Sequence, residues 1–193
     1  MIGWFNSKNY VDKNNLGYCR EWYQRDSLIQ GLTECSDNDI IMISELDEIY
    51  NHITVEKVFN KFDPDKIYCM RQNSYYYYLN LLKEKHWVGG RIATYKKFST
   101  FRLSEFKHIR DTVISNGGWH FSYQGSIDQI KEKLLSFCHF VTEDSDTIGS
   151  IQEKVDSFND PFDRGERLKR AEIDNTYPQY LLDNLEHFKH MIV

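Results

Sequence analysis

The sequence has few cysteines and no long apolar run, and these absences exclude several classes of protein. Its four cysteines show no CxxC spacing, so they indicate reduced core or strand residues, not a disulfide framework or a zinc site. They are Cys19, Cys35, Cys69 and Cys138. No apolar run could span a bilayer, and the N-terminus lacks a charged-then-apolar signal pattern. As given, the sequence predicts a cytoplasmic protein with no membrane segment.

Clusters of positive charge are also missing. The formal net charge is −5 and there is no basic block, so we expect no nucleic-acid partner. Internal repeats and low-complexity linkers are absent as well. With 193 residues, of which 40% are hydrophobic and 27% charged, the chain predicts a single folded domain spanning residues 1–193. Aromatic residues make up 15%, and core packing explains most of them.

An acidic segment that follows an apolar run is the most informative stretch. Residues 40–43 are IIMI, which predicts a central strand covered on both faces. Glu45, Asp47 and Glu48 follow directly. Carboxylates so close together resist ionising, and a divalent cation would relieve that conflict at the carboxyl end of a strand. The same acids also fit a solvated strand-to-helix turn, and the spacing alone does not separate the two interpretations.

Apolar periodicity predicts helices along much of the chain. We expect them over residues 20–32, 54–62, 126–138, 148–158 and 181–192. Trp22, Leu28, Ile29 and Leu32 would form the apolar face of the first helix. Thr54 is the expected cap of the second helix.

Further local signals mark the start of two helices and the extended segments between them. Ser126 and Gln129 fit a capping box, and Pro178 suits the first turn of the last helix. Residues 66–82 and 86–95 are typical of strands, and Gly89 with Gly90 indicates a bulge or a close backbone approach. We expect a turn at residues 116–118 and an exposed charged segment at 160–170.

Five stretches, in order over nearly the whole chain, resemble glycosyltransferase family 17. They are REWYQRDSLIQGL (20–32), DIIMISELDEI (39–49), HWVGGRIATY (86–95), ISNGGWHFSY (114–123) and YPQYLLDNLEHFKHMI (177–192). The best-known activity of that family is the bisecting β-1,4-N-acetylglucosaminyltransferase of N-glycans. The resemblance implies an α/β fold of GT-A type, with a mixed central sheet flanked by helices. It also implies a UDP-sugar donor, a glycan acceptor, Mn²⁺ or Mg²⁺, and inversion, and eukaryotic relatives are Golgi type II membrane proteins.

The resemblance implies a metal site in two of these stretches. Glu45-Leu46-Asp47 takes the position of the DxD motif that holds the cation in GT-A enzymes, with Glu where the family usually has Asp. His120, in GGWHFS, would complete the ligand set, and imidazole suits Mn²⁺ better than Mg²⁺. A packed or hydrogen-bonded histidine near a turn is the alternative interpretation of His120.

The remaining expected roles concern the donor, the acceptor and the general base. Donor contacts would come from Arg25, Arg71, Arg91 and Trp119, and acceptor contacts from Tyr76 and Tyr78. A salt bridge from Arg25 to Asp26 or Glu21, and core packing of the aromatic rings, are the alternatives. We expect Asp128 to be the base, with Glu132 behind it. His139 falls where relatives carry a histidine followed two positions later by an acid, and this chain has Val141 there.

The N-terminal region departs from the family pattern. About 19 residues precede REWYQRD, too few for a βαβ unit of ~30 residues, so we expect the first nucleotide-binding strand to be missing from an N-terminally shortened chain. This shortening, Glu45 and Val141 keep a second hypothesis open, a non-catalytic glycan- or partner-binding remnant of the same fold. A metal-dependent hydrolase would need a second metal cluster, for which the sequence gives no indication.

Overall fold

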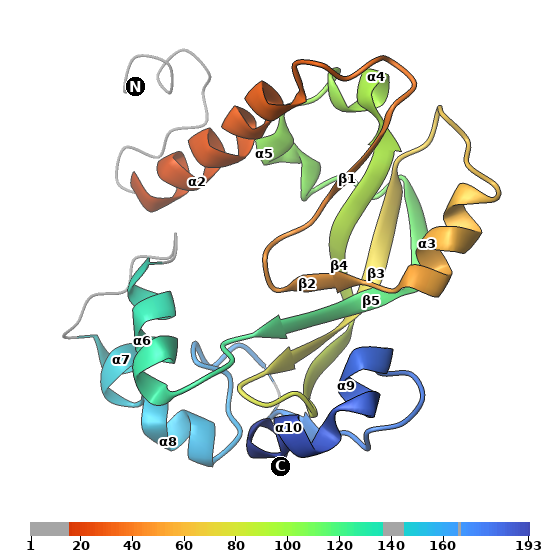
Figure 1. Cartoon of the computed structure of the whole chain (residues 1–193). Helices are drawn as coiled ribbons and strands as arrows, with labels where there is room; N and C mark the ends of the chain where they lie inside the picture. Colours follow the sequence, from red (N-terminus) through yellow and green to blue (C-terminus); the bar gives the residue numbers. More distant parts are fainter. Residues whose placement is uncertain (1–15, 137–144, 166) are drawn as a thin grey trace.

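A mixed β-sheet runs through the computed structural model, which describes residues 16–136, 145–165 and 167–193 (Figure 1). Its strand order is β1-β4-β3-β5-β2, with β6 paired to β4. The strands are β1 (Ile40–Ile43), β2 (Glu48–Tyr50), β3 (Tyr68–Tyr76), β4 (Leu81–Thr94), β5 (Thr112–Ser122) and β6 (Lys169–Arg170). β3 and β5 are parallel, and the other pairs are antiparallel. The predicted α/β class with a mixed sheet is confirmed.

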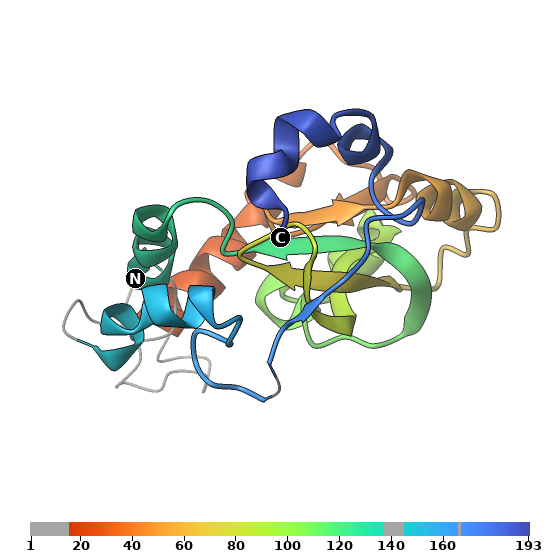
Figure 2. The ribbon, with the colours of Figure 1, turned by 90° about the horizontal axis from the view of Figure 1, so that it is seen from below.

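Helices flank the sheet and gather in three places. The C-terminal helices lie across one side of it (Figure 2), where Trp119 packs with Tyr177 and Leu181. α6, α7 and α8 group at one end of the molecule, and α2 lies near α5 at the other (Figure 1). The helices are α2 (Leu16–Ser27), η1 (Leu28–Leu32), α3 (His52–Phe59), α4 (Tyr95–Phe98), α5 (Leu103–Phe106), α6 (Ile127–Ser136), α7 (Asp146–Gly149), α8 (Ile151–Asp156), α9 (Gln179–Asp183), α10 (Leu185–Phe188) and η2 (Lys189–Met191). Within the described ranges, no helix has both the length and the apolar character needed to cross a bilayer.

β1 is an edge strand, so the prediction of a central strand covered on both faces is wrong. Among the described residues its partner is β4. Ile40 and Met42 are about two-fifths exposed, at 40% and 39%, whereas Ile41 and Ile43 pack against a core cluster. An apolar run indicates a strand, but it does not determine how many neighbours that strand has, because those neighbours come from distant parts of the chain.

The predicted helices form, with corrections to their faces and caps. The helix over residues 20–32 is confirmed as α2 followed by the 3₁₀ turn η1, but Leu28 and Ile29 are exposed, so the predicted apolar face is wrong. α3 is capped by Asn51, whose side chain accepts from the backbone N–H of Ile53 at 3.1 Å. Thr54, the expected cap, is instead buried and donates its hydroxyl to the carbonyl of Asn116.

The capping box at the start of α6 is confirmed. The backbone N–H of Ser126 donates to the Gln129 side chain at 2.8 Å, and the Gln129 N–H donates to the Ser126 hydroxyl at 3.3 Å. Ile130 and Leu134 of the predicted stripe are buried, and residues 137–138 lie outside the described residues. The two later helices also form, the first in two short pieces, α7 and α8, and the second in three, α9, α10 and η2. Pro178 directly precedes α9.

The predicted turn at residues 116–118 is a bulge inside β5. Met70 of β3 pairs with Ile114, and Gln72 then pairs with Gly118, so β3 advances by two residues while β5 advances by four. Gly118 has φ = 148°, and a Cβ there would overlap the carbonyl oxygen of Ile49 on β2. Glycine is therefore required at this position by both conformation and space.

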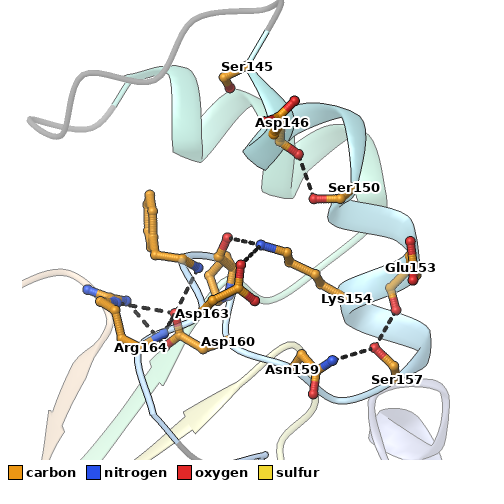
Figure 3. Close-up of polar contacts among 12 residues, drawn as sticks. Ser145, Asp146, Ser150, Glu153, Lys154, Ser157, Asn159, Asp160, Asp163 and Arg164 are labelled. Atoms are coloured by element: carbon orange, nitrogen blue, oxygen red, sulfur yellow. Dashed lines mark hydrogen bonds and ion pairs between the residues drawn. The ribbon is translucent and has the colours of Figure 1, made fainter.

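The start of the charged segment 160–170 is buried, so the prediction of exposure is wrong there. Asp160 accepts from the backbone N–H of Phe162 at 2.8 Å and from Arg164 Nε at 3.2 Å, and it pairs with Lys83 Nζ at 3.4 Å (Figure 3 shows the Arg164 contacts). We call Lys83, Asp160 and Arg164 the Asp160 cluster. Burial opposes ionisation, but the Phe162 N–H and the Arg164 guanidinium hold the pKa of Asp160 below its usual value. A neighbouring ion pair, Lys154 with Asp163, lies beside it (Figure 3).

Candidate active site

Four polar side chains from three separate parts of the chain meet beside the sheet. Lys133 Nζ, from α6, lies 2.6 Å from Asp47 Oδ2 and donates to the Ser122 hydroxyl at 2.9 Å. Ser122, at the end of β5, donates to the same Asp47 oxygen at 3.1 Å. His120 Nε2 lies 3.4 Å from that oxygen. We call Asp47, His120, Ser122 and Lys133 the Asp47 cluster.

Side chains from β3 and β4 hold the imidazole of His120 in place. His120 on β5 stands opposite Glu48 on β2 and Ser74 on β3. The Ser74 hydroxyl is hydrogen-bonded to Nδ1 at 2.9 Å, and the Trp87 ring from β4 stacks on the imidazole with centroids 4.7 Å apart. Because the ring is bonded at one nitrogen and covered on one face, its other nitrogen is directed at Asp47.

The next acid along the chain, Glu48, is buried behind His120. Its carboxylate accepts from the Trp87 indole N–H at 2.7 Å and from the Glu45 backbone N–H at 3.2 Å, so it closes the acidic turn. Burial raises the pKa of Glu48, against the lowering effect of the Trp87 hydrogen bond. A Cβ at Gly89 would overlap the Gln72 amide and the Glu48 carboxyl, which confirms the expected close approach there.

The neighbours of Asp47 stabilise the ionised form of its carboxyl group, although the side chain is partly buried. Burial works against the charged form, but His120 and Lys133 together hold the pKa of the Asp47 carboxyl well below its usual range. The side chains of Asp47 and Lys133 remain 24% and 35% exposed, so the ion pair is open to solvent on one side. Lys133 also lies over the ring of Tyr123, with Nζ 5.0 Å from the centroid.

Glu45 and Arg25 form a second charged group close to the turn. Arg25 on α2 forms ion pairs with Glu45 and, at 2.8 Å, with Glu21, which in turn pairs with Lys107 at 3.0 Å. The alternative interpretation of Arg25 as a salt-bridging residue is thus confirmed for Glu21. Asp26, the other partner considered, accepts instead from the Ser104 backbone N–H. The donor role of Arg25 stays a prediction.

Of the three other predicted donor residues, Arg91 and Trp119 are occupied by contacts within the protein. Arg91 is 4% exposed and donates to the carbonyls of Val88 and Lys107, which ties β4 to the end of α5. Trp119 is buried on the opposite face of β5 from His120, and its indole N–H donates to the Thr176 carbonyl at 3.1 Å. Arg71 is half-buried on β3. The described contacts bring none of these three into the Asp47 cluster.

The predicted acceptor and base residues also lie outside the cluster. Tyr76 is buried and packs edge-on against Tyr123 at 5.0 Å, and Tyr78 is half-buried against Phe158. Asp128 is exposed in the first turn of α6, on the same helix as Lys133. His139 and Val141 lie outside the described residues. The roles predicted for these side chains stay predictions.

Four residues of the site were missed by sequence reasoning. Ser74 lies on β3, which pairs with β5, and Trp87 lies on β4, which pairs with β3; neither pairing could be read from spacing. Trp87 does stand in one of the stretches that resemble the family. Ser122 stands in GGWHFSY, so the motif itself was a signal. Lys133 lies two helical turns after Ser126, and α6 directs it towards Asp47. On a helical projection of residues 126–136, Lys133 falls on nearly the same side as Ser126, the residue of this range that lies closest in sequence to GGWHFSY.

The acidic turn does not present a ready-made cation site. Asp47 Oδ2 already accepts from an ammonium and a hydroxyl, and Glu45 is paired with Arg25. Over the described residues, no group of three His, Cys, Asp or Glu side chains is arranged to hold a metal ion. Asp47 and His120 do lie together as predicted, whereas Glu45 contributes its charge to a different pair.

The fold defines an α/β protein whose polar side chains converge at the ends of two strands on one face of a mixed sheet. The chain belongs to glycosyltransferase family 17, because the model of that family matches residues 3–193, almost the entire sequence. Membership indicates glycosyltransferase activity and therefore a sugar donor and an acceptor. Neither a curated protein nor a solved structure matches the chain.

Proposed function

We propose that this protein transfers a sugar, N-acetylglucosamine, from a UDP donor to a glycan hydroxyl with inversion at the anomeric carbon, on a fold of GT-A type. Family membership supports sugar transfer. One observation carries the assignment of the site: Asp47 and His120, from the SELDEI and GGWHFSY motifs, lie 3.4 Å apart. They converge beside the carboxyl end of β5, and open α/β sheets bind their ligands at the carboxyl ends of strands.

The reaction requires two kinds of assistance from the protein. The acceptor oxygen attacks the anomeric carbon from the face opposite the diphosphate, the bond from that carbon to the diphosphate oxygen breaks, and its electron pair leaves with UDP. The acceptor proton passes to a base, for which Asp128 stays our prediction. Positive charge fixed beside the diphosphate stabilises the leaving group.

The Mn²⁺ or Mg²⁺ expected at Glu45, Asp47 and His120 stays a prediction. The arrangement of these residues does not fit it, because one oxygen of Asp47 is engaged by Lys133 and Ser122 and because Glu45 pairs with Arg25. No step of the proposed reaction is therefore assigned to an ion.

Thermal unfolding with UDP, with and without Mn²⁺, tests the proposal. We expect UDP to raise the melting temperature of the wild-type protein and Asp47→Ala to abolish the rise. Asp65→Ala is the matched control, because Asp65 is exposed and distant from the Asp47 cluster in the described contacts. Release of UDP from UDP-N-acetylglucosamine in the presence of a glycan should follow the same pattern. Absence of both a thermal shift and UDP release with every UDP-sugar would sink the proposal.

A second candidate is a non-catalytic glycan- or partner-binding protein of the same fold. The observation that favours it is the ion pair between Glu45 and Arg25, which occupies one residue expected at the cation and one expected at the donor. Binding to immobilised glycans without release of UDP from any UDP-sugar would select this candidate over the enzyme.

A further inference from the structure

We propose that the ammonium of Lys133 supplies the positive charge that meets the donor's diphosphate, so that UDP binds without a divalent cation. This inference rests on the proposed function and extends it, because it names a charged group of the chain for the leaving group. Lys133 is outside the motifs that resemble the family. Lys133 is carried by α6, and the capping box between Ser126 and Gln129 fixes the residue at which this helix begins.

The first support is the position of the ammonium relative to Asp47. Lys133 Nζ lies 2.6 Å from Oδ2, on the carboxylate that the DxD-like triplet would offer to a cation. A divalent ion bound to that oxygen, at the usual ~2.0–2.6 Å, would lie within a few ångströms of the ammonium. Two positive charges that share one carboxylate at such a distance repel each other in a partly buried site. Lysine and metal therefore compete for one oxygen.

The second support is the number of donors. An ammonium has three N–H groups and no acceptor. Asp47 and the Ser122 hydroxyl take two of them in the described structure. Because Ser122 also donates to Asp47, the three side chains form a closed triangle that fixes Nζ in place. The ammonium therefore has one further N–H to offer, and the side chain is 35% exposed, so a phosphate oxygen can approach it from solvent.

The third support comes from the other cations around the acidic turn. Arg25 is shared between two carboxylates, Glu21 and Glu45. Arg91 is buried and donates to backbone carbonyls. Lys133, by contrast, is held by a single carboxylate and faces the partly exposed side of the cluster. Ser122 and Asp47 thus act as positioning residues for the ammonium.

Calorimetric titration with UDP, in EDTA and in Mn²⁺, tests the role of Lys133. We expect wild-type protein to bind UDP in EDTA, and Lys133→Met to weaken that binding about tenfold or more, since a charge-assisted hydrogen bond contributes on that scale. Lys133→Arg should restore most of the affinity. Lys131→Met, which removes a lysine from the same helix outside the cluster, should leave the affinity unchanged. Uridine should bind equally to wild type and Lys133→Met, because it lacks the diphosphate.

Electron paramagnetic resonance of Mn²⁺ provides a readout independent of UDP. We expect wild-type protein and Asp47→Ala to show the same Mn²⁺ spectrum, because no ion binds at Asp47. If UDP binds in Mn²⁺ but not in EDTA, and Lys133→Met binds it as wild type does, this inference is overturned while the proposed function stands. If UDP binds in neither buffer to wild-type protein, the proposed function and the inference fail together. If both Lys133→Met and Lys133→Arg lose UDP binding while circular dichroism shows that they are folded, positive charge at position 133 is not sufficient for binding, and the inference is overturned.

Discussion

The Asp47 cluster and the Asp160 cluster are both built around an aspartate, but the two aspartates differ in their exposure to solvent. Each pairs an aspartate with a lysine and further donors. The Asp160 side chain is 1% exposed and accepts from a backbone N–H as well as from Arg164 and Lys83. The Asp47 side chain is 24% exposed, and its lysine is 35% exposed. Burial of its aspartate makes the Asp160 cluster a structural anchor for the 160–164 segment, whereas the Asp47 cluster is open to solvent on one side.

Asp160→Asn should have the largest effect on stability. It leaves Lys83, which is 14% exposed, without its ionised partner, and removing one member of a buried pair costs about 3 kcal/mol. We expect the free energy of unfolding in urea to fall by about that amount. Glu186→Gln is the matched control, because Glu186 and its partner Lys189 are 91% and 74% exposed, so the free energy of unfolding should change by less than about 0.5 kcal/mol.

The cost of Asp160→Asn should also depend on pH. The pKa of Asp160 is lowered in the folded protein, so its ionisation stabilises the fold above the unfolded pKa of about 4 and this contribution disappears as pH falls through the folded value. The stability difference between wild type and Asp160→Asn should therefore be constant from pH 7 to 5 and narrow below pH 4. A difference that widens on acidification would contradict the described pairing.

Trp87→Phe should have an intermediate effect. Phenylalanine keeps an aromatic ring beside His120 but removes the indole N–H that Glu48 accepts at 2.7 Å. A buried acceptor that loses its donor costs about 2 kcal/mol. We expect that loss in the free energy of unfolding, measured by circular dichroism in urea. A change below about 0.5 kcal/mol would mean that water or another donor replaces the indole.

Asp47→Asn should have the smallest effect on stability and sharpens the comparison most directly, because it repeats the substitution made at Asp160. Lys133 remains partly hydrated when its partner is neutral, so we expect a loss of about 1 kcal/mol. UDP binding should suffer far more than stability does. If Asp47→Asn instead destabilises the protein as much as Asp160→Asn, the Asp47 cluster is a structural anchor as well.

Sequence reasoning was reliable where the signal was local. The capping box at Ser126 and Gln129 was confirmed by both hydrogen bonds, since all the atoms involved lie within one turn. The acidic turn and its proximity to His120 were also anticipated, through two motifs that resemble the family. The family itself was correctly identified.

Errors arose where distant segments decide the outcome. β1 was predicted to be central because its four residues are apolar, yet its place at the sheet edge depends on how β3, β4 and β5 pair. Glu45 was assigned to the cation site, and its ion pair with Arg25 depends on where α2 packs. Lys133 carried no signal that pointed to Asp47, because its role follows from the approach of α6 to the sheet.

The bulge in β5 controls which side chain reaches Asp47. Successive residues of a strand point to opposite faces of the sheet. Whether the number of residues between Ile114 and His120 is odd or even therefore decides which side chain, the imidazole of His120 or the indole of Trp119, faces the acidic turn. With Ile114 held in register, deleting one of the two glycines at 117–118 would place Phe121 at the position of His120, whereas deleting both would keep His120 on the same face without the bulge. The bulge adds two residues to β5, and because this number is even, His120 stays on the face of the sheet that carries Asp47.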